Sequence, residues 1–160
     1  MKFTVGVGKS DFAALRESGN YYVDKTEMIY ELVNDTDNEV TLFTRPRRFG
    51  KTLMMSMMEN FFSVRKNSKR IFENLAITEH EEFCKEWMNQ YPVLFVSFKD
   101  VEAEDFDGAY KMLASRLADV CIGFADISRN EVVNPADRDV FERLMYKRAE
   151  EDEIKNSIKY

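Results

Sequence analysis

A glycine, a lysine and a threonine at residues 50–52 follow one another in the order found in loops that hold nucleotide phosphates. In such a loop, backbone N–H groups wrap the phosphates, the lysine reaches the outer phosphates and the next hydroxyl binds Mg²⁺. Lys51 and Thr52 have the side chains for these roles, and Gly50 can take a positive φ and leave room for a phosphate. The motif G-x-x-x-x-G-K-[ST] is incomplete, because Arg45 stands where its first glycine belongs.

A second Gly-Lys-Ser sequence, at residues 8–10, competes with the first for this role. The run EVTLFT at residues 39–44 has the β-branched and aromatic character of a buried strand. Residues 51–64 carry apolar side chains at the spacing of a helix with one buried face. This strand and helix flank residues 50–52 as the motif requires, and residues 8–10 lack both. We therefore predict the phosphate site at residues 50–52, the alternative being a chance tripeptide in a basic turn.

The loop before this helix is a positive island on an acidic chain. Four of the seven residues from Arg45 to Lys51 are basic, whereas 29 acidic and 23 basic residues give the chain a net charge of -6. This acidic balance argues against a protein that coats nucleic acid or an anionic membrane, so any anion site must be local. The arginines either contact phosphate or a partner, or are solvated and pair with carboxylates. Pro46 biases Arg45 toward extended backbone, which favours a bend only at residues 49–50.

Composition favours a single globular domain in a reducing compartment. The 160 residues, of which 44% are hydrophobic, suffice for one domain with a core and are too few for two. Cys84 and Cys121 lack the spacing of a disulfide scaffold, which predicts a cytoplasmic setting. No apolar run approaches the roughly 18 residues of a membrane span. We expect one domain over residues 1–160 and no membrane partner.

The pattern of apolar residues predicts helices and two strands. The strands are residues 39–44 and 91–98, and a helix separates them. Two strands separated by a helix predict an α/β fold, a parallel sheet with covering helices. The predicted helices cover residues 11–17, 25–34, 51–64, 79–90 and 105–124, with further helices from about residue 136 and near residue 152.

Other clusters carry little chemistry. His80 and Cys84 lie four residues apart on a predicted helix, but two ligands do not make a zinc site, and His80 is the only histidine. Residues 104–108, EDFDG, resemble the start of a calcium loop, but the spacing puts Ala114 where a bidentate glutamate belongs. We interpret this run as the acidic N-terminus of a helix.

Four blocks of the sequence resemble one family of bacterial and archaeal proteins, in the same order. They are NYYVDKTEMIYELV (20–33), VTLFTRPRRFGKTLMMSMMENFF (40–62), IFENLAI (71–77) and YPVLFVSFKDV (91–101). The chain is similar to the predicted AAA-ATPase-like family, in which an R-P-R-R-F-G-K-[ST] loop replaces the usual phosphate-binding sequence. The resemblance implies a P-loop NTPase-like fold that binds ATP and Mg²⁺, and it makes the missing first glycine a family trait.

The same resemblance implies which residues hold the nucleotide. The implied nucleotide-binding residues are Arg47, Arg48, Phe49, Gly50, Lys51, Thr52 and Leu53, with Thr52 also on Mg²⁺. The block YYVDKT, residues 21–26, is expected beside the nucleotide, near its base or ribose. The alternative is that Asp24 caps a helix while Tyr22 and Val23 pack in the core.

Hydrolysis requires an acidic pair at the end of a strand, which holds Mg²⁺ and orients the attacking water. By resemblance this pair lies downstream of Tyr160, so the chain is interpreted as the N-terminal part of an ATPase domain. Asp100 is the one catalytic candidate within the chain, although Lys99 separates it from the strand. The competing hypothesis is a catalytically inactive interaction module, whose basic loop binds nucleic acid or an acidic protein partner.

Overall fold

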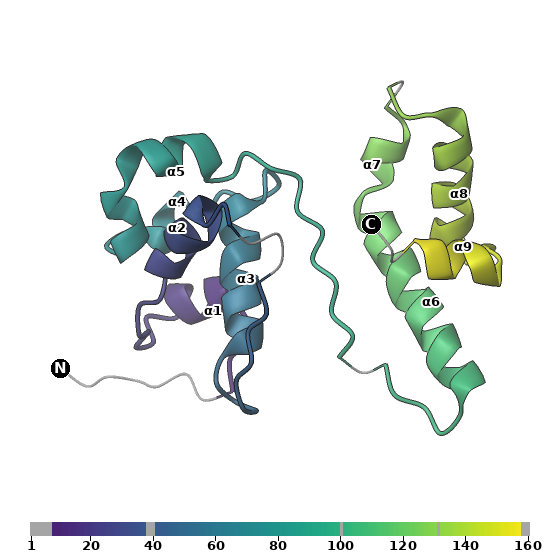
Figure 1. Ribbon diagram of the computed structural model, residues 1–160, viewed down its shortest axis with the longest axis horizontal. Coiled ribbons are helices and arrows are strands. Elements are labelled where there is room, and N and C mark those ends of the chain that lie inside the picture. The colour runs from purple at the N-terminus through teal and green to yellow at the C-terminus, as the bar shows by residue number, and fades with distance from the viewer. Residues whose placement is uncertain (1–7, 38–40, 100, 131, 158–160) are drawn as a thin grey trace. The chain divides into compact units, whose positions relative to one another are not determined.

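The computed structural model describes residues 8–37, 41–99, 101–130 and 132–157 (Figure 1). The chain divides into two compact units, residues 1–93 and residues 94–160. Each unit has its own hydrophobic core. The expected single domain over the whole chain stays a prediction. Within the described ranges, no helix combines the length and apolar character needed to cross a bilayer.

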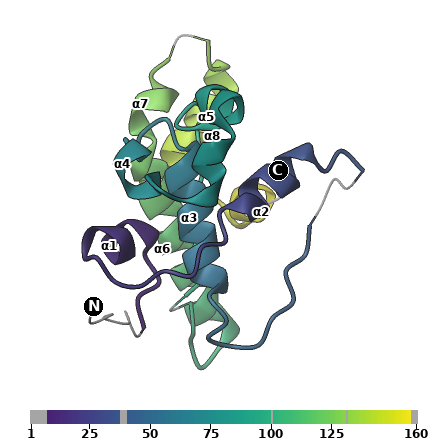
Figure 2. The same ribbon diagram turned by 90° about the vertical axis from the view of Figure 1, so that its left-hand side faces the viewer.

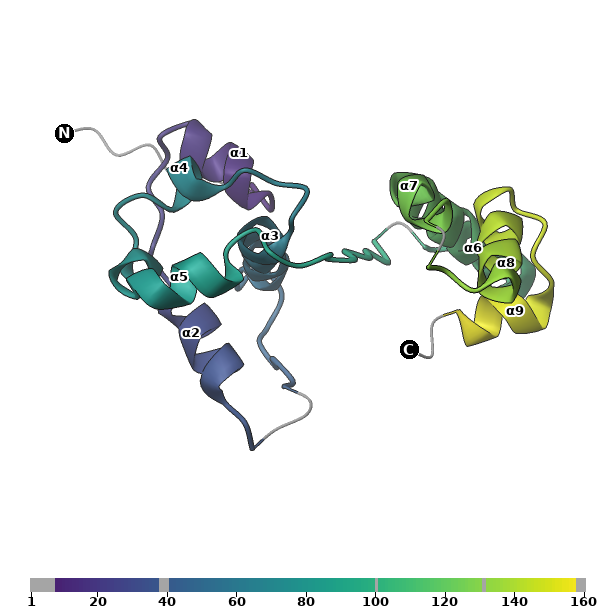
Figure 3. The same ribbon diagram turned by 90° about the horizontal axis from the view of Figure 1, so that it is seen from above.

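The first unit packs short helices around one long helix, α3. Its helices are α1 (Phe12–Glu17), α2 (Glu27–Asn34), α3 (Lys51–Phe62), α4 (Lys69–Phe72), the 3-10 helix η1 (Ala76–Glu79) and α5 (Glu81–Trp87). Seen from above, α1, α2, α4 and α5 lie around α3 (Figure 3). Each of these elements contributes to one core of Phe12, Ile29, Met57, Phe61, Phe72, Leu75, Ile77 and Phe83.

The buried face of α3 fixes the helix in place. Met57 and Phe61, one turn apart, are 1% and 0% exposed, as the apolar spacing over residues 51–64 predicts. The hydroxyl of Ser56, also buried, accepts a hydrogen bond of 3.1 Å from the N–H of Phe12 at the start of α1. These contacts determine where the N-terminal end of α3 lies, and that end carries the predicted site.

The predicted α/β, P-loop NTPase-like fold with a parallel sheet is wrong. In the described part of the chain the regular structure is helical, and no two segments pair as strands. Neither residues 41–44 nor residues 92–99 form a strand. Several of their large apolar side chains are exposed instead, with Leu42 at 82%, Leu94 at 62% and Phe98 at 55%, whereas Phe43 and Phe95 are half-buried.

The error arises because strand pairing is not a local property of sequence. β-branched and aromatic runs favour extended backbone, but a strand is stable only when a neighbour takes up its N–H and C=O groups. The described residues offer one isolated parallel bridge, between Ser63 and Tyr91. The N–H of Val64 donates to the carbonyl of Tyr91 at 2.8 Å, and the N–H of Tyr91 donates to the carbonyl of Phe62 at 3.0 Å, but these contacts do not continue into a ladder of paired strands in the described residues. The apolar run at residues 91–98 favours extended backbone, but it does not determine which segment would pair with it in a sheet.

The second unit consists of α6 (Phe106–Gly123), α7 (Ala125–Ser128), α8 (Pro135–Met145) and α9 (Glu151–Asn156). The side chain of Asp105 accepts from the N–H of Gly108 at 2.7 Å and caps α6, as expected for the acidic run EDFDG. Its core is Leu117, Cys121, Leu144 and Ile154, from α6, α8 and α9.

Candidate functional site

The loop that leads into α3 turns through two residues with left-handed backbone. Gly50 has φ 80° and ψ 16°, and Arg48 has φ 69°. Glycine adopts this conformation without strain, whereas a side chain costs roughly 1–2 kcal/mol. A Cβ on Gly50 would meet no atom within 4 Å, so conformation and not space requires glycine here. The turn already includes residues 47–48, earlier than the bend that the sequence favoured at residues 49–50.

Lys51, the first residue of α3, folds back into this loop. Its Nζ donates to the backbone carbonyl of Arg45 and, at 3.1 Å, to that of Pro46. One ammonium group therefore closes the loop at the point where the helix begins. A cation at a helix N-terminus opposes the helix dipole, at a cost of about 0.3–1 kcal/mol. An anion bound at this point interacts favourably with both the Lys51 ammonium group and the positive end of the helix dipole.

The N-terminal turn of α3 carries no cap. No side chain accepts from its first amides, and its first turn contains no acidic residue. The first N–H groups of any helix have no partner within the helix, and they point toward a ligand placed at its end. Thr52, in this turn, is exposed. The arrangement offers amides for an anion and a hydroxyl oxygen of the kind that binds Mg²⁺.

Three arginines add positive charge to the loop. Arg45, Arg47 and Arg48 are all exposed. None of them forms an ion pair within the ranges that the structure describes, so the expected alternative of pairing with carboxylates is not observed there. Their guanidinium groups are accessible to solvent, and guanidinium has the planar donor geometry that matches phosphate.

A cavity of about 440 Å³ lies beside the loop. The segment between α1 and α2 crosses α3 here and supplies one wall (Figure 2), with Tyr21, Val23 and Lys25 among its residues. Arg48 and Phe49 of the loop supply another wall. The cavity exposes apolar surface, since Tyr21 is 54%, Val23 59% and Phe49 61% exposed. The structure thus brings the YYVDKT block beside the loop, and its place next to a nucleotide stays a prediction.

The same block also has a structural role, which agrees with the alternative for Tyr22 alone, since the N-cap residue of α2 is Thr26 and not Asp24. The ring of Tyr22 packs edge-on against Phe12, with centroids 5.3 Å apart, but Val23 is exposed and not in the core. The Asp24 carboxylate accepts from the N–H and hydroxyl of Thr26 and from the N–H of Ala76. Partial burial raises the pKa of the Asp24 carboxyl, but the hydrogen bonds from these three donors outweigh that effect and hold the pKa below its usual range. Asp24 therefore anchors the start of α2 to η1.

Lys9, from the discarded Gly-Lys-Ser sequence, also lines the cavity. Its Nζ donates to the Ser18 hydroxyl at 2.7 Å and to the Ala14 carbonyl at 3.4 Å. The helix that follows, α1, is only six residues long, and the Asp11 side chain caps it by accepting from the N–H of Ala14. Residues 8–10 thus lack the long helix of a phosphate loop, yet sequence analysis missed the place of Lys9 in the cavity wall. No local pattern signals it, because the fold alone brings α1 near the loop.

His80 and Cys84 are not part of a metal centre among the described residues. His80 Nε2 lies 2.8 Å from Glu27 Oε1, and the His80 ring stacks on Tyr30 at 3.8 Å. The Cys84 thiol donates to the carbonyl of Ile77 at 3.2 Å. In the described residues, no three side chains of the metal-binding types come together. Asp100, the catalytic candidate, lies outside the described residues.

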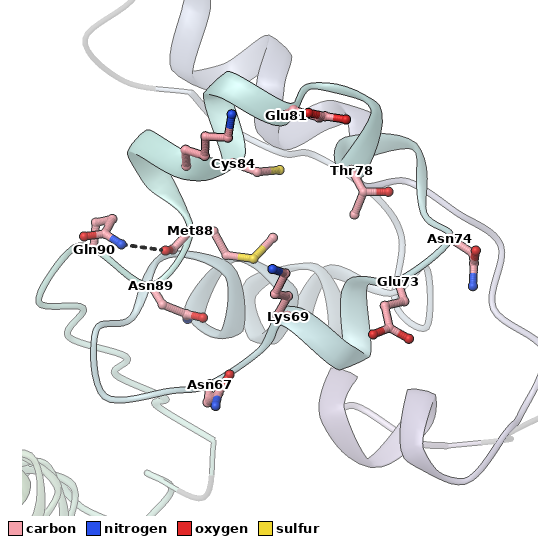
Figure 4. A pocket seen from close by; sticks show the side chains of 11 residues that line it. Asn67, Lys69, Glu73, Asn74, Thr78, Glu81, Cys84, Met88, Asn89 and Gln90 are labelled. Carbon is pink, nitrogen blue, oxygen red and sulfur yellow. Dashed lines mark hydrogen bonds between the residues drawn. The ribbon is translucent and has the colours of Figure 1, made fainter.

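A larger cavity, of about 660 Å³, lies elsewhere in the first unit, between α4, η1 and α5 (Figure 4). Its walls mix charges of both signs with amides. They include Lys69, Glu73, Thr78, Cys84, Met88 and Asn89. Cys84 is the one thiol among the described lining residues, and burial raises the pKa of this thiol, which disfavours the reactive thiolate. The charged residues of this cavity are of both signs, whereas those of the loop before α3 are all basic.

Comparison with known proteins gives two matches. A family model described as "Predicted AAA-ATPase" matches residues 6–159. An "Uncharacterized protein in vnfD 5'region" from Azotobacter chroococcum mcd 1 is 31% identical over 106 residues, which cover 64% of the chain and 19% of that relative. The chain thus spans about a fifth of the length of the curated relative that it matches. No solved structure matches the chain.

Proposed function

The chain belongs to the predicted AAA-ATPase family, and on this basis we propose that it binds ATP with Mg²⁺ through residues 47–53. One observation supports the proposal most directly. The Lys51 ammonium lies inside a loop that contains two positive-φ residues, at the start of a helix without a cap. Cation and amides both stabilise negative charge at the same place. A triphosphate meets this requirement, because its charges are close enough together to contact the ammonium and the amides at once.

Each residue of the stretch has a role in this proposal. The Lys51 ammonium exchanges its contacts with the Arg45 and Pro46 carbonyls for the outer phosphate oxygens. Gly50 holds the φ of 80° that places the first amides of α3, including that of Leu53, around the phosphates. The Arg47 and Arg48 guanidinium groups contact phosphate oxygens from outside, and Phe49 contacts the part of the nucleotide that lies beyond the phosphates, in the cavity beside the loop.

The Thr52 hydroxyl is the ligand that the chain offers to Mg²⁺. When bound, the ion neutralises phosphate charge and orients the outer phosphate groups. Hydrolysis belongs to the proposal only for a longer protein that also supplies an acidic pair. In the described residues, no group of three His, Cys, Asp or Glu side chains is placed to hold a metal ion.

The experiment is a calorimetric titration of Mg·ATP into the 160-residue chain and into Lys51→Ala. We expect binding that weakens about 10- to 100-fold in the variant, the factor that corresponds to the 1.5–3 kcal/mol of charged hydrogen bonds. Lys147→Ala is the matched control, since Lys147 is an exposed lysine of the second unit whose Nζ donates to Ser115 at 2.9 Å. Absence of binding by the unaltered chain, or equal affinity in Lys51→Ala, overturns the proposal.

A second candidate function rests on the three exposed arginines, which form no ion pair with a described carboxylate. In it the chain is an inactive interaction module whose loop holds nucleic acid or an acidic protein. Binding of a single-stranded oligonucleotide that weakens steeply with salt, persists in Lys51→Ala and is lost on replacing all three arginines supports this function. The acidic net charge of -6 limits such a footprint to the loop.

A further inference from the structure

We propose that the 440 Å³ cavity beside the loop holds the base of the nucleotide by ring stacking, and does not select adenine over guanine. The inference rests on the proposed function. Gly50 and Leu53 belong both to the cavity wall and to the N-terminal turn of α3. A ligand whose phosphates lie at that turn therefore reaches the cavity with its other end. The volume falls within the roughly 300–1,000 Å³ typical of small-molecule sites.

The walls suit a flat aromatic ligand. Tyr21 and Phe49 come from different segments and both line the cavity, with 54% and 61% of their surfaces exposed. Val23, 59% exposed, adds an aliphatic surface beside Tyr21. Exposed aromatic side chains are platforms for nucleobases, because every base has a π-face that gains from covering apolar surface. A base in the cavity removes this surface from water.

The floor of the cavity is already ordered. The Tyr22 hydroxyl donates to Met57 Sδ at 3.2 Å, and Met57 is 1% exposed in the core. Tyr22 also packs against the ring of Phe12, which is fully buried. A base that enters meets side chains fixed by the core, so little ordering is required on binding.

The polar side chains in the walls are unsuited to choosing between purines. The described residues that line the cavity include no Asp, Glu, Asn or Gln. Adenine presents an amino donor where guanine presents an oxygen acceptor; a side-chain amide reads the first, and an arginine or lysine reads the second. The cations present are Lys9, Lys25 and Arg48. Lys9 Nζ already donates to Ser18 and Ala14, and the triphosphate attracts Lys25 and Arg48 more strongly than a neutral base does. Stacking is tolerant of the base, so ATP and GTP bind alike.

The test measures the affinity of Mg·ATP, Mg·GTP and Mg·tripolyphosphate for the 160-residue chain and its variants. We expect ATP and GTP to bind within about 5-fold of each other, and tripolyphosphate, which lacks a base, about 10-fold or more weaker. Tyr21→Ala and Phe49→Ala each weaken ATP and GTP about 10-fold and leave tripolyphosphate unchanged. The ring-retaining variants Tyr21→Phe and Phe49→Tyr keep the affinity for both nucleotides. Tyr146→Ala is the matched control, because Tyr146 is 61% exposed, as Phe49 is, and lies in the second unit.

The outcomes separate this inference from the proposed function. A preference of more than about 100-fold for either nucleotide overturns base-tolerant stacking, as does equal weakening of nucleotides and tripolyphosphate by the alanine variants. If all three ligands bind alike with a dependence on Lys51, the base subsite is absent and the phosphate site stands. If none of the three binds, both proposals fail. Far-UV circular dichroism of each variant confirms that the helices are retained.

Discussion

The long helix of the first unit and the two long helices of the second unit begin in opposite ways. In α6 and α8, the side chains of Asp105 and Asn134 accept from first-turn amides at 2.7 and 2.9 Å, and each first turn contains an aspartate. In α3, Gly50 supplies no side-chain acceptor, the first turn has no acidic residue and Lys51 brings a positive charge. In α6 and α8, side chains accept from the first-turn amides, and acidic residues complement the helix dipole. In α3, no side chain accepts from these amides, and no acidic residue of the first turn balances the charge of Lys51.

This difference indicates what each helix end is for. Capping residues and first-turn acids each stabilise a helix by a few tenths to about 2 kcal/mol, so their presence in α6 and α8 needs only a structural reason. The start of α3 departs from the same rules in several ways at once, and local rules are broken together mainly at functional sites. The substitutions below make α3 resemble the second unit, or make the second unit resemble α3.

The largest effect is expected from placing an acid in the first turn of α3. Thr52→Glu removes the hydroxyl proposed for Mg²⁺ and repels phosphate, so Mg·ATP affinity should fall about 100-fold or more. The same change complements the helix dipole and should raise the free energy of unfolding of the first unit by about 0.3–1 kcal/mol. Calorimetry measures the first effect, and urea unfolding followed by fluorescence of the single tryptophan, Trp87, measures the second.

Thr52→Gln is the control for this pair of effects, since it removes the hydroxyl without adding charge. It should weaken Mg·ATP binding and leave the stability nearly unchanged. Retention of wild-type affinity by Thr52→Glu contradicts both the Mg²⁺ role of Thr52 and the contrast between the helix ends.

The next effect is the reverse substitution, in the second unit. Asn134→Ala removes the acceptor of the Ala136 N–H at the start of α8 and should destabilise that unit by about 1 kcal/mol. Cys121 is buried in the core of the second unit, so its rate of thiol labelling under increasing urea reports this change once Cys84 is replaced by serine. Asn134→Ser keeps a capping oxygen and should restore the wild-type rate. Loss of Mg·ATP affinity in Asn134→Ala would show that the two helix ends are not independent.

The sequence predicted the local features of the site and failed on the features that depend on distant contacts. α3 begins at Lys51, as predicted, because apolar spacing and a glycine before the helix act within a few residues. The prediction of a sheet is wrong because the sequence of residues 91–98 does not indicate which segment, if any, pairs with it. The place of Lys9 in the cavity wall could not be predicted for the same reason, since packing of α1 against α3 brings it there.

The smallest expected effect concerns how the stability of each unit changes at acidic pH. Asp24 in the first unit and Glu153 in the second both have pKa values below the usual range. For Asp24, partial burial raises the pKa and the donors at Thr26 and Ala76 outweigh it, whereas Glu153 is lowered first by hydrogen bonds from Arg143. A carboxyl with a depressed folded-state pKa contributes stability above its unfolded pKa, about 3.9 for aspartate. That contribution is lost as the pH falls through the lower, folded value.

Asp24→Asn should therefore cost the first unit less than about 1 kcal/mol at pH 7, because solvent screens the partly exposed carboxylate. The cost should shrink toward zero as the pH falls below 4, where the wild-type carboxyl becomes protonated. Urea midpoints from Trp87 fluorescence at pH 7, 5 and 3 measure the convergence of the two proteins. Glu153→Gln should leave these midpoints unchanged at every pH, because the carboxylate of Glu153 bonds to Arg143 within the second unit. If the urea midpoints of wild type and Asp24→Asn differ by the same amount at all three pH values, the lowered pKa assigned to Asp24 is contradicted. Only a carboxyl whose pKa differs between the folded and unfolded chains makes the difference in stability depend on pH.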